Sequence, residues 1–395
     1  MELRQQKGME ICKQKQVKPT REGWLVQSQS GAGSYKVDEL FNCSCPDAQF
    51  HKATCKHAYA VRYFIKAEIE TPQGKVIQEK RITYPQAWAA YTKAQNEEVK
   101  LFDELLSDLV AGIETPAHKT GRPFTPYKDA VFCAVQKVYS QLSSRRAYSL
   151  YRHSKNRGQV GKTPNYNVIN LLLNKPELTP ILQELISVTA APLKDVETDW
   201  AVDSSGFRTR CFCQYAEQKY DLKREHKFVK AHIITGVKTN IVSAVEITPE
   251  NGADAPKFPV LVQKTADGGF TVKEVSADKA YGSAENYNAV AGLGGQAYIP
   301  FKSNASGQSH GIKYRLWRKM YHYFQLNQQE FFEHYHKRSN VETTFSAIKK
   351  KLGDTLKSKN PIAQENELLC KILAYNLTVV IHEMHELGIK PDFKV

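Results

Sequence analysis

Residues 199–207 read DWAVDSSGF, an apolar strand-like stretch that ends in Asp203 and a Ser-Ser-Gly turn. The same arrangement returns at 272–278, VKEVSAD, where Asp278 ends a second apolar stretch. Further strand-like stretches, RCFCQY, FVKAHIITGV, IVSAVEI and QAYIPFK, alternate with helical ones from Val196 onward. This alternation predicts an α/β domain with a mixed sheet over 196–395.

Three acids of this region form a candidate site. Asp203 and Asp278 are expected at the carboxyl ends of strands, where open α/β sheets place their ligands. Glu342 lies in the helical stretch 328–353, QQEFFEHYHKRSNVETTFSAIKKKLG. At about 100° per residue, one face of this helix, about a 60° arc, carries Tyr335, Arg338, Glu342 and Lys349. A separate apolar stripe is expected to pack: Val341, Phe345, Ile348 and Leu352.

Carboxylates gathered in one site resist joint ionisation unless a cation neutralises them, which favours a divalent metal site. Two ions about 3.5–4 Å apart could activate a water or a 3′-hydroxyl and stabilise the leaving oxygen of a phosphodiester. Mg²⁺, or Mn²⁺, suits oxygen ligands and keeps positions open for phosphate. Each acid also has an ordinary interpretation, because a strand-end Asp commonly forms a turn or a cap and a helical Glu is commonly solvated.

The N-terminal region holds a second candidate metal site. Cys43-Ser-Cys45, nine residues, and Cys55-Lys-His57 form a CxCx9CxH array that suits tetrahedral zinc. The stretches WLVQSQS and SYKVDEL before the array predict a hairpin, and a helix is predicted from its last ligands onward. His51, inside the loop, is a rival ligand. Zinc here could simply fold a small module, and that module could also contact DNA or protein.

Residues 84 to about 190 predict helices, with HKTGRPFTP at 118–126 as an interruption. One segment of this region, 145–162, is basic and lacks acidic residues, which suits docking on the DNA backbone. Its cations are Arg145, Arg146, Arg152, Lys155, Arg157 and Lys162.

The 395-residue chain has 55 Lys and Arg against 41 Asp and Glu, a net charge of +14 that favours a polyanionic partner. It has no apolar run long enough to span a bilayer and no signal peptide, so we expect a soluble intracellular protein with no membrane partner. The eight cysteines do not form an evenly spaced disulfide framework. Cys211 and Cys213 are interpreted as core residues, and His232 as a buried histidine with an active-site role as the alternative.

The signature Tyr-x2-Arg-x3-Glu-x6-Lys, at Tyr335, Arg338, Glu342 and Lys349, resembles that of the DDE transposases of bacterial insertion sequences. DSSGF at 203–207, ADKAYGS at 277–283 and AYIPFK at 297–302 look like strand motifs of the same family. The resemblance implies a ribonuclease-H-like fold and a catalytic-metal role for the three acids. It also implies that Tyr335, Arg338 and Lys349 hold transposon-end phosphates. The zinc array and its hairpin resemble a SWIM zinc finger.

From this resemblance we expect a SWIM-like zinc-binding module at 1–75, a helical DNA-binding region at 76–195 and a DDE catalytic domain at 196–395. The expected activity is cleavage of double-stranded transposon ends and strand transfer into target DNA, by a homodimer in the cytoplasm at the nucleoid. Two alternatives are a non-catalytic DNA-binding protein derived from a transposase and a nuclease that does not join strands. Only 63 residues separate Asp278 from Glu342, which leaves little room for the β-rich insertion of some family members.

Overall fold

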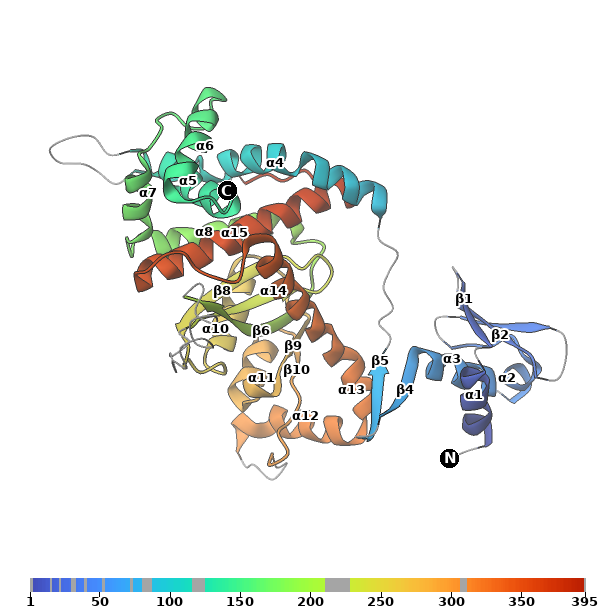
Figure 1. The fold of residues 1–395 in the computed structure, drawn as a ribbon. Helices are drawn as coiled ribbons and strands as arrows, with labels where there is room; N and C mark the ends of the chain where they lie inside the picture. The colour runs from blue at the N-terminus through green and yellow to red at the C-terminus, as the bar shows by residue number, and fades with distance from the viewer. Residues whose placement is uncertain are drawn as a thin grey trace, which may run out of the picture. The chain divides into compact units, whose positions relative to one another are not determined.

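The structure is a computed structural model that forms two compact units, Met1–Gln86 and Ala87–Val395. It describes residues 3–14, 16–20, 23–29, 33–38, 41–51, 54–71, 74–79, 87–115, 125–209, 228–305 and 311–393. Figure 1 labels the helices and strands of both units.

The first unit is a small α+β module. An antiparallel sheet of β1 (Val17–Thr20), β2 (Gly23–Gln27) and β3 (Ser34–Val37) precedes two helices, α2 (Pro46–His51) and α3 (Lys56–Ile65). The predicted hairpin is the β2–β3 pair, and the predicted helix is α3. Helix α1 (Leu3–Lys13) packs on α3, and a two-stranded sheet of β4 (Lys66–Thr71) and β5 (Gly74–Glu79) follows. The core includes Ile11, Val26, Val37 and Val61.

The close contact of α1 with α3 depends on Gly8. A Cβ at this position would lie 2.6 Å from Tyr59 Cβ and 2.9 Å from Lys56 O. We expect Gly8→Ala to destabilise the unit by about 1–3 kcal/mol, because overpacking outweighs the roughly 0.5–1 kcal/mol that Ala gains in a helix. Urea unfolding of the zinc-loaded protein measures this. Gly33→Ala is the control, since its Cβ would meet nothing within 4 Å; equal stability of the two variants would contradict the expectation.

A five-stranded mixed sheet forms the centre of the second unit, in the order β10–β9–β6–β7–β8. β6, β7 and β8 are antiparallel neighbours, whereas β9 runs parallel to β6 and β10 parallel to β9. The predicted ribonuclease-H-like mixed sheet is therefore confirmed. The predicted strand RCFCQY, with Cys211 and Cys213, lies outside the described residues. The bounds are β6 (Asp199–Arg208), β7 (Phe228–Gly236), β8 (Val242–Pro249), β9 (Glu274–Ala277) and β10 (Gln296–Tyr298).

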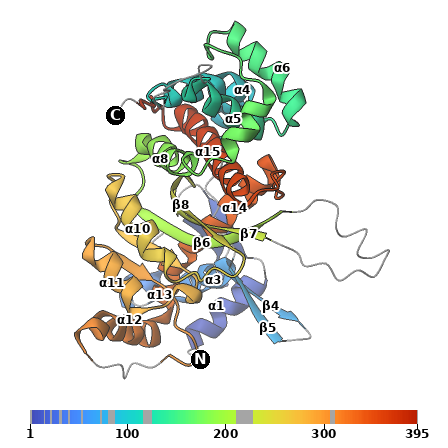
Figure 2. The same cartoon turned by 90° about the vertical axis from the view of Figure 1, so that its left-hand side faces the viewer.

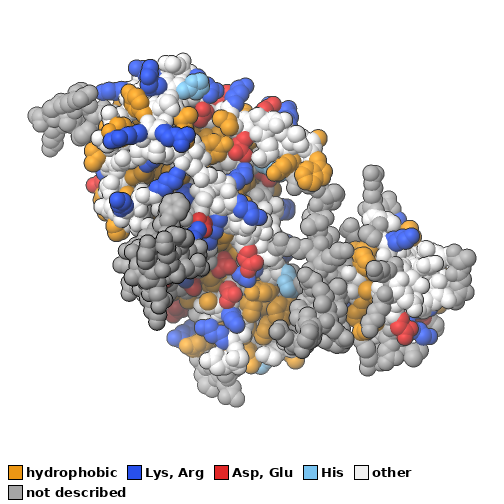
Figure 3. Space-filling model, in the orientation of Figure 1, with side chains coloured by type: hydrophobic (Ala, Val, Ile, Leu, Met, Phe, Trp, Pro, Cys, Tyr) orange, Lys and Arg blue, Asp and Glu red, His pale blue; other side chains and the backbone are white. Residues whose placement is uncertain are grey.

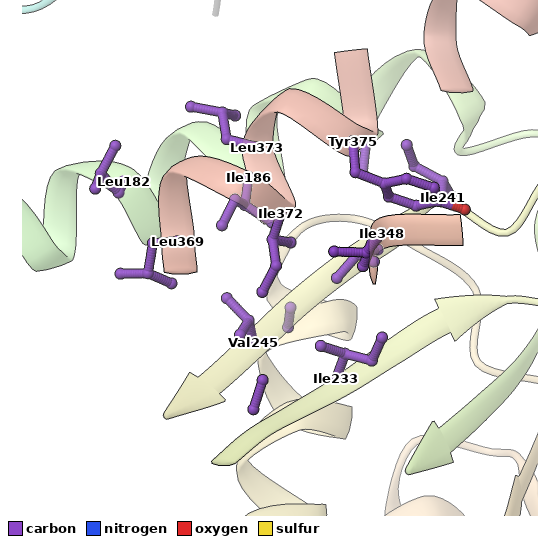
Figure 4. Packing of buried hydrophobic residues seen from close by; sticks show 14 of the residues in the cluster. Leu182, Ile186, Ile233, Ile241, Val245, Ile348, Leu369, Ile372, Leu373 and Tyr375 are labelled. Carbon is purple, nitrogen blue, oxygen red and sulfur yellow. The ribbon is translucent and has the colours of Figure 1, made fainter. Parts of the chain in front are cut away.

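Helices cover both faces of this sheet. Glu246 of β8 binds Lys257 and Lys264 of α10 (Lys257–Asp267), at 3.2 and 2.6 Å. The adjacent Val245 instead points towards α15 (Pro361–Glu386), as Figure 4 shows. Because successive side chains of a strand point to opposite faces, α10 covers one face and α15 the other. Figure 2 shows the sheet between α10 and α14 (Ser339–Leu352).

The helices before the sheet share its core. α15 is buried continuously over 366–381 and contacts α4 (Trp88–Val110), α5 (Tyr127–Tyr139) and α8 (Leu178–Ala190). Figure 4 shows Ile186 of α8, Ile372 of α15 and Ile233 of β7 in one apolar layer. The other helices before the sheet are α6 (Ser144–Asn156), α7 (Tyr166–Leu173) and the short η1 (Ala191–Leu193). The interruption predicted at 118–126 falls largely outside the described residues.

Between β9 and α14 the regular elements among the described residues are helices and 3₁₀ turns, apart from the short β10. The helices and turns are η2 (Lys279–Tyr281), α11 (Ala284–Gly292), η3 (Ile312–Tyr314), α12 (Arg315–Leu326), α13 (Gln328–Tyr335) and η4 (His336–Arg338). The stretch 328–353 was predicted as one helix, but the 3₁₀ turn η4 divides it into α13 and α14. The predicted apolar stripe of α14 is buried: Val341, Phe345, Ile348 and Leu352.

Candidate functional site

Asp203 and Asp278 follow a matched pair of residues on adjacent strands. β6 and β9 run parallel with Val202 opposite Ala277, so the next residue of each strand is one of the two acids. Asp203 Oδ1 accepts a hydrogen bond from Ser204 N at 2.8 Å. Asp278 also caps the η2 turn, since its Oδ1 accepts from Ala280 N at 3.0 Å. The structure thus places the two carboxylates just beyond the last paired residues of β6 and β9. β9 ends before Asp278 as predicted, but β6 continues to Arg208. The predicted strand end at Asp203 and the Ser-Ser-Gly turn are therefore wrong, because residues 203–206 pair with β7.

The third acid is joined to the first through an arginine. Glu342 lies in the first turn of α14, which packs on β6 and β7. Arg338 Nη1 donates to Asp203 Oδ2 at 2.6 Å, and Arg338 Nη2 donates to Glu342 Oε1 at 2.5 Å. Asp278 is close enough to act electrostatically on both Asp203 and Arg338. Two of the acids therefore bind one guanidinium group, and the third acts on it electrostatically.

The charged groups of this cluster influence the ionisation of Asp203. Burial raises the pKa of Asp203, and the charges of Asp278 and Glu342 act in the same direction, whereas the Ser204 N–H and Arg338 oppose them. The three carboxylates do not all lie within 4.8 Å of one another, and Arg338 bridges two of them. The Asp203 side chain is 20% exposed and that of Glu342 57% exposed. Carboxylate oxygens are the ligands that hard divalent ions such as Mg²⁺ prefer.

The other predicted residues of the signature line the same region. Lys349 Nζ donates to Ser205 Oγ at 2.7 Å, and burial lowers the pKa of Lys349. The Arg338 guanidinium carbon lies 5.9 Å from the centre of the Tyr335 ring, and burial raises the pKa of Tyr335. An open pocket of about 480 Å³ lies beside the acids. Its lining includes Asp203, Ser205, Glu342, Lys349, Lys350 and Asp354.

Two features of this region had not been predicted from the sequence. Lys337 Nζ donates to Asp199 Oδ2 and Glu274 Oε2, both at 2.6 Å, and so ties η4 to the first residues of β6 and β9. Arg208 donates to both carboxylate oxygens of Asp354, at 2.8 and 2.6 Å, across the rim of the pocket. Asp199, Glu274 and Asp354 do not follow apolar stretches, so the sequence pattern alone did not predict these ion pairs.

The predicted zinc ligands come together in the first unit. Cys43, Cys45, Cys55 and His57 are all buried, and one ligand atom of each lies within 4.8 Å of the others. Cys55 Sγ and His57 Nδ1 are 3.9 Å apart, close to the roughly 3.6 Å that tetrahedral bond lengths imply. His57 Nε2 is buried without a hydrogen-bond partner among the described residues. The donor set fits zinc, and the side chain of the rival His51 lies outside the described ones.

The basic segment predicted to dock on DNA is mainly helix α6. The Arg and Lys side chains of the segment are exposed, while Ala147, Tyr151 and Ser154 of α6 are buried. Figure 3 shows Lys and Arg side chains over the helical part of the second unit. Arg157 is 3.4 Å from Asp103 and Arg145 stacks 5.7 Å from the Tyr166 ring. The exposed cations are Arg145, Arg146, Arg152, Lys155, Arg157 and Lys162.

Comparison with known proteins assigns both regions to families. The family "Transposase DDE domain" matches residues 196–377, and the family "SWIM zinc finger" matches residues 41–64. The match to the first family includes Asp203, Asp278 and Glu342, and the match to the second includes all four zinc candidates. No curated protein and no solved structure matched the chain. Among the described helices none is both long and apolar enough to cross a membrane. Residues 196–377 are therefore a DDE transposase domain, and residues 41–64 are a SWIM zinc finger that precedes it in the chain.

Proposed function

A DDE domain gives the chain a transposase-type function, and we propose that it cleaves the ends of a transposon and transfers the 3′-hydroxyl into target DNA. What supports the proposal is that Arg338 binds both Asp203 and Glu342 while Asp278, next to the paired end of β9, acts electrostatically on Asp203 and Arg338. Each acid comes from a different element, β6, the β9–η2 junction or α14, so their convergence is a property of the fold.

In this proposal Asp203, Asp278 and Glu342 hold Mg²⁺ or Mn²⁺. A bound pair of such ions would activate water, and later the 3′-hydroxyl, for in-line attack on a phosphodiester. Arg338 neutralises the acids in the free protein and turns to a DNA phosphate when they bind metal. Lys349 and Tyr335, which lie beside the acids, hold neighbouring phosphates, because an ammonium and a phenolic hydroxyl both donate to phosphate oxygens.

We also propose a division of labour along the chain. The zinc module at 1–75 and the helical region at 76–195 recognise the transposon end, and the domain at 196–395 performs the chemistry. Two chains bound as a homodimer would pair two ends, and the protein would act in the cytoplasm at the nucleoid. What supports a DNA role for the helical region is the exposed cationic face of α6.

Neutralising this face should weaken end binding and its salt dependence together. For the double variant Arg146→Gln/Arg152→Gln we expect the slope of log K against log salt to fall by about 2, because each lost phosphate contact removes roughly 0.9. Fluorescence anisotropy over a range of salt concentrations measures the slope. The matched control is Lys93→Gln/Lys100→Gln, which removes two exposed cations from α4. Identical slopes for the two double variants would remove α6 from the DNA interface.

Incubation with end DNA and Mg²⁺ tests the proposed activity. The DNA comes from the short inverted repeats that should flank the gene between direct duplications of the target. We expect nicks that leave 3′-hydroxyls, followed by joined products when target DNA is added. Binding without nicking would favour a non-catalytic DNA-binding protein, and nicking without joining would favour a nuclease of the same fold.

A further inference from the structure

The residue after Asp203 points to the opposite face of the sheet. Asp203 lies opposite Ile233 and Ser204 opposite His232 in the β6–β7 register, so Ser204 and His232 share a face. Ser204 therefore connects the two faces: its N–H donates to Asp203 Oδ1 at 2.8 Å, and its hydroxyl donates to Asp254 Oδ1 at 3.0 Å. Ser204 thus contacts Asp203 through its backbone and Asp254 through its side chain.

Asp254 is the centre of a partly buried polar network. Lys230 Nζ lies 2.6 Å from Asp254 Oδ1, and the side chains of both residues are 22% exposed. His232 Nδ1 lies 3.3 Å from the same oxygen and its side chain is 0% exposed. Burial lowers the pKa of His232 to about 4, so Lys230 supplies the positive charge opposite Asp254. Lys230 thus holds the carboxylate in place, while the buried His232, whose Nδ1 makes no hydrogen bond among the described residues, packs beside it.

The loop that carries Asp254 packs closely against this network. His232 Nε2 is 2.9 Å from Thr248 Oγ1, and a Cβ at Gly252 would lie 2.3 Å from that same hydroxyl oxygen. The missing side chain at Gly252 therefore lets the loop between β8 and α10 close over β8. A larger residue there would push Asp254 away from Ser204.

The same loop is also tied to the turn that carries Asp278. Asn286 Nδ2 donates to Ala255 O at 3.2 Å and to Tyr281 O at 2.6 Å. The Tyr281 hydroxyl is buried next to Ser204. A single network thus connects the residue after Asp203 with the residues after Asp278.

We propose that Asp254, held by Lys230, is a positioning residue: by binding the Ser204 hydroxyl it fixes Ser204, whose N–H orients the Asp203 carboxylate, and it thereby sets the affinity of the acid cluster for divalent ions. The inference rests on the proposed function, because it assumes that Asp203 is a metal ligand. Outer hydrogen-bond partners of metal ligands commonly contribute about 10–100-fold in metal affinity or activity. Asp254 itself touches neither metal nor DNA.

The test measures Mn²⁺ binding to the full-length chain in complex with end DNA. The electron paramagnetic resonance signal of free Mn²⁺ reports how much of the ion is unbound. We expect Asp254→Ala and Ser204→Ala each to weaken binding by about 10-fold or more. The double variant should be little weaker than either single one, since both changes remove the same hydrogen bond. Asp267→Ala is the control, because Asp267 is exposed at the end of α10 and, within the described part of the chain, bonds locally to Gln263.

Cleavage kinetics add a readout that a merely structural role would not change. We expect the half-saturating Mn²⁺ concentration to rise in both variants while the rate at saturating Mn²⁺ stays near the wild-type rate. Wild-type Mn²⁺ affinity in folded Asp254→Ala would overturn the inference. If Asp254→Ala unfolds, Ser204→Ala, which removes a single hydroxyl, is tested instead, and wild-type Mn²⁺ affinity in that variant would also overturn the inference. Absence of Mn²⁺ binding by the wild-type complex would instead overturn the proposed function, and the inference with it.

Discussion

Replacing Asp203 with Asn or Glu342 with Gln is expected to lower the rate of end cleavage by about 1,000-fold or more. Each change removes a charged ligand from the acid cluster, and several kcal/mol of metal-derived stabilisation of the transition state correspond to at least three factors of ten. End binding should stay nearly unchanged, because in this account the acids hold metal and make no contact with the DNA sequence. A gel-based cleavage assay and an anisotropy titration on the same samples measure the two effects.

Matched controls come from exposed acids elsewhere in the same unit. Asp267→Asn and Glu333→Gln make the same chemical changes on the surfaces of α10 and α13, and both should cleave at the wild-type rate. If Asp203→Asn or Glu342→Gln kept cleavage, the acid concerned would not belong to the catalytic site. A parallel loss of end binding would mean that the variant had lost its fold rather than its metal.

Loss of zinc is expected to unfold the first unit. Four buried ligands surround the ion position in a module with a small apolar core. Zinc binding contributes about 10–16 kcal/mol to the folding of such modules, as much as the whole stability of a typical domain. We therefore expect Cys55→Ser to carry no zinc and to lose amide hydrogen-exchange protection over 41–64. Elemental analysis and hydrogen-exchange mass spectrometry measure the two effects.

A second cysteine of the unit provides the comparison for this experiment. Cys12 lies in α1, outside the ligand group, so Cys12→Ser should keep its zinc and its protection. The second unit has a separate core and should keep its protection in both variants. Unchanged protection over 41–64 in zinc-free Cys55→Ser would contradict a structural role for the ion.

The sequence predicted the acids of the site because they follow apolar stretches or mark a helix face, although only Asp278 follows the end of its strand and Asp203 lies within β6. Asp203 and Asp278 follow apolar stretches, and parallel neighbours with aligned registers bring such residues together. The zinc array was equally readable, since its four ligands are close in sequence and need one hairpin and one helix to converge. Patterns of this kind can be recognised in a short stretch of sequence, because the spacing of the residues follows the period of the helix or strand that carries them.

Other features depend on contacts between distant segments and leave no periodic signal. The η4 turn breaks the predicted helix where Lys337 is tied to Asp199 and Glu274. Asp254 is a single acid in a loop, and only the folded sheet places it beside Ser204. The shared core of the helices and the sheet did have a signal, because residues 366–381 of α15 are too apolar all round for a surface helix.

The most direct measurement is the anomalous scattering of Mn²⁺ in a crystal of the full-length chain bound to end DNA. The account predicts metal peaks between the carboxylates of Asp203, Asp278 and Glu342, with the Arg338 guanidinium turned from these acids to a phosphate. Metal peaks elsewhere in the protein, or Arg338 still joining Asp203 to Glu342 with no metal beside them, would contradict it.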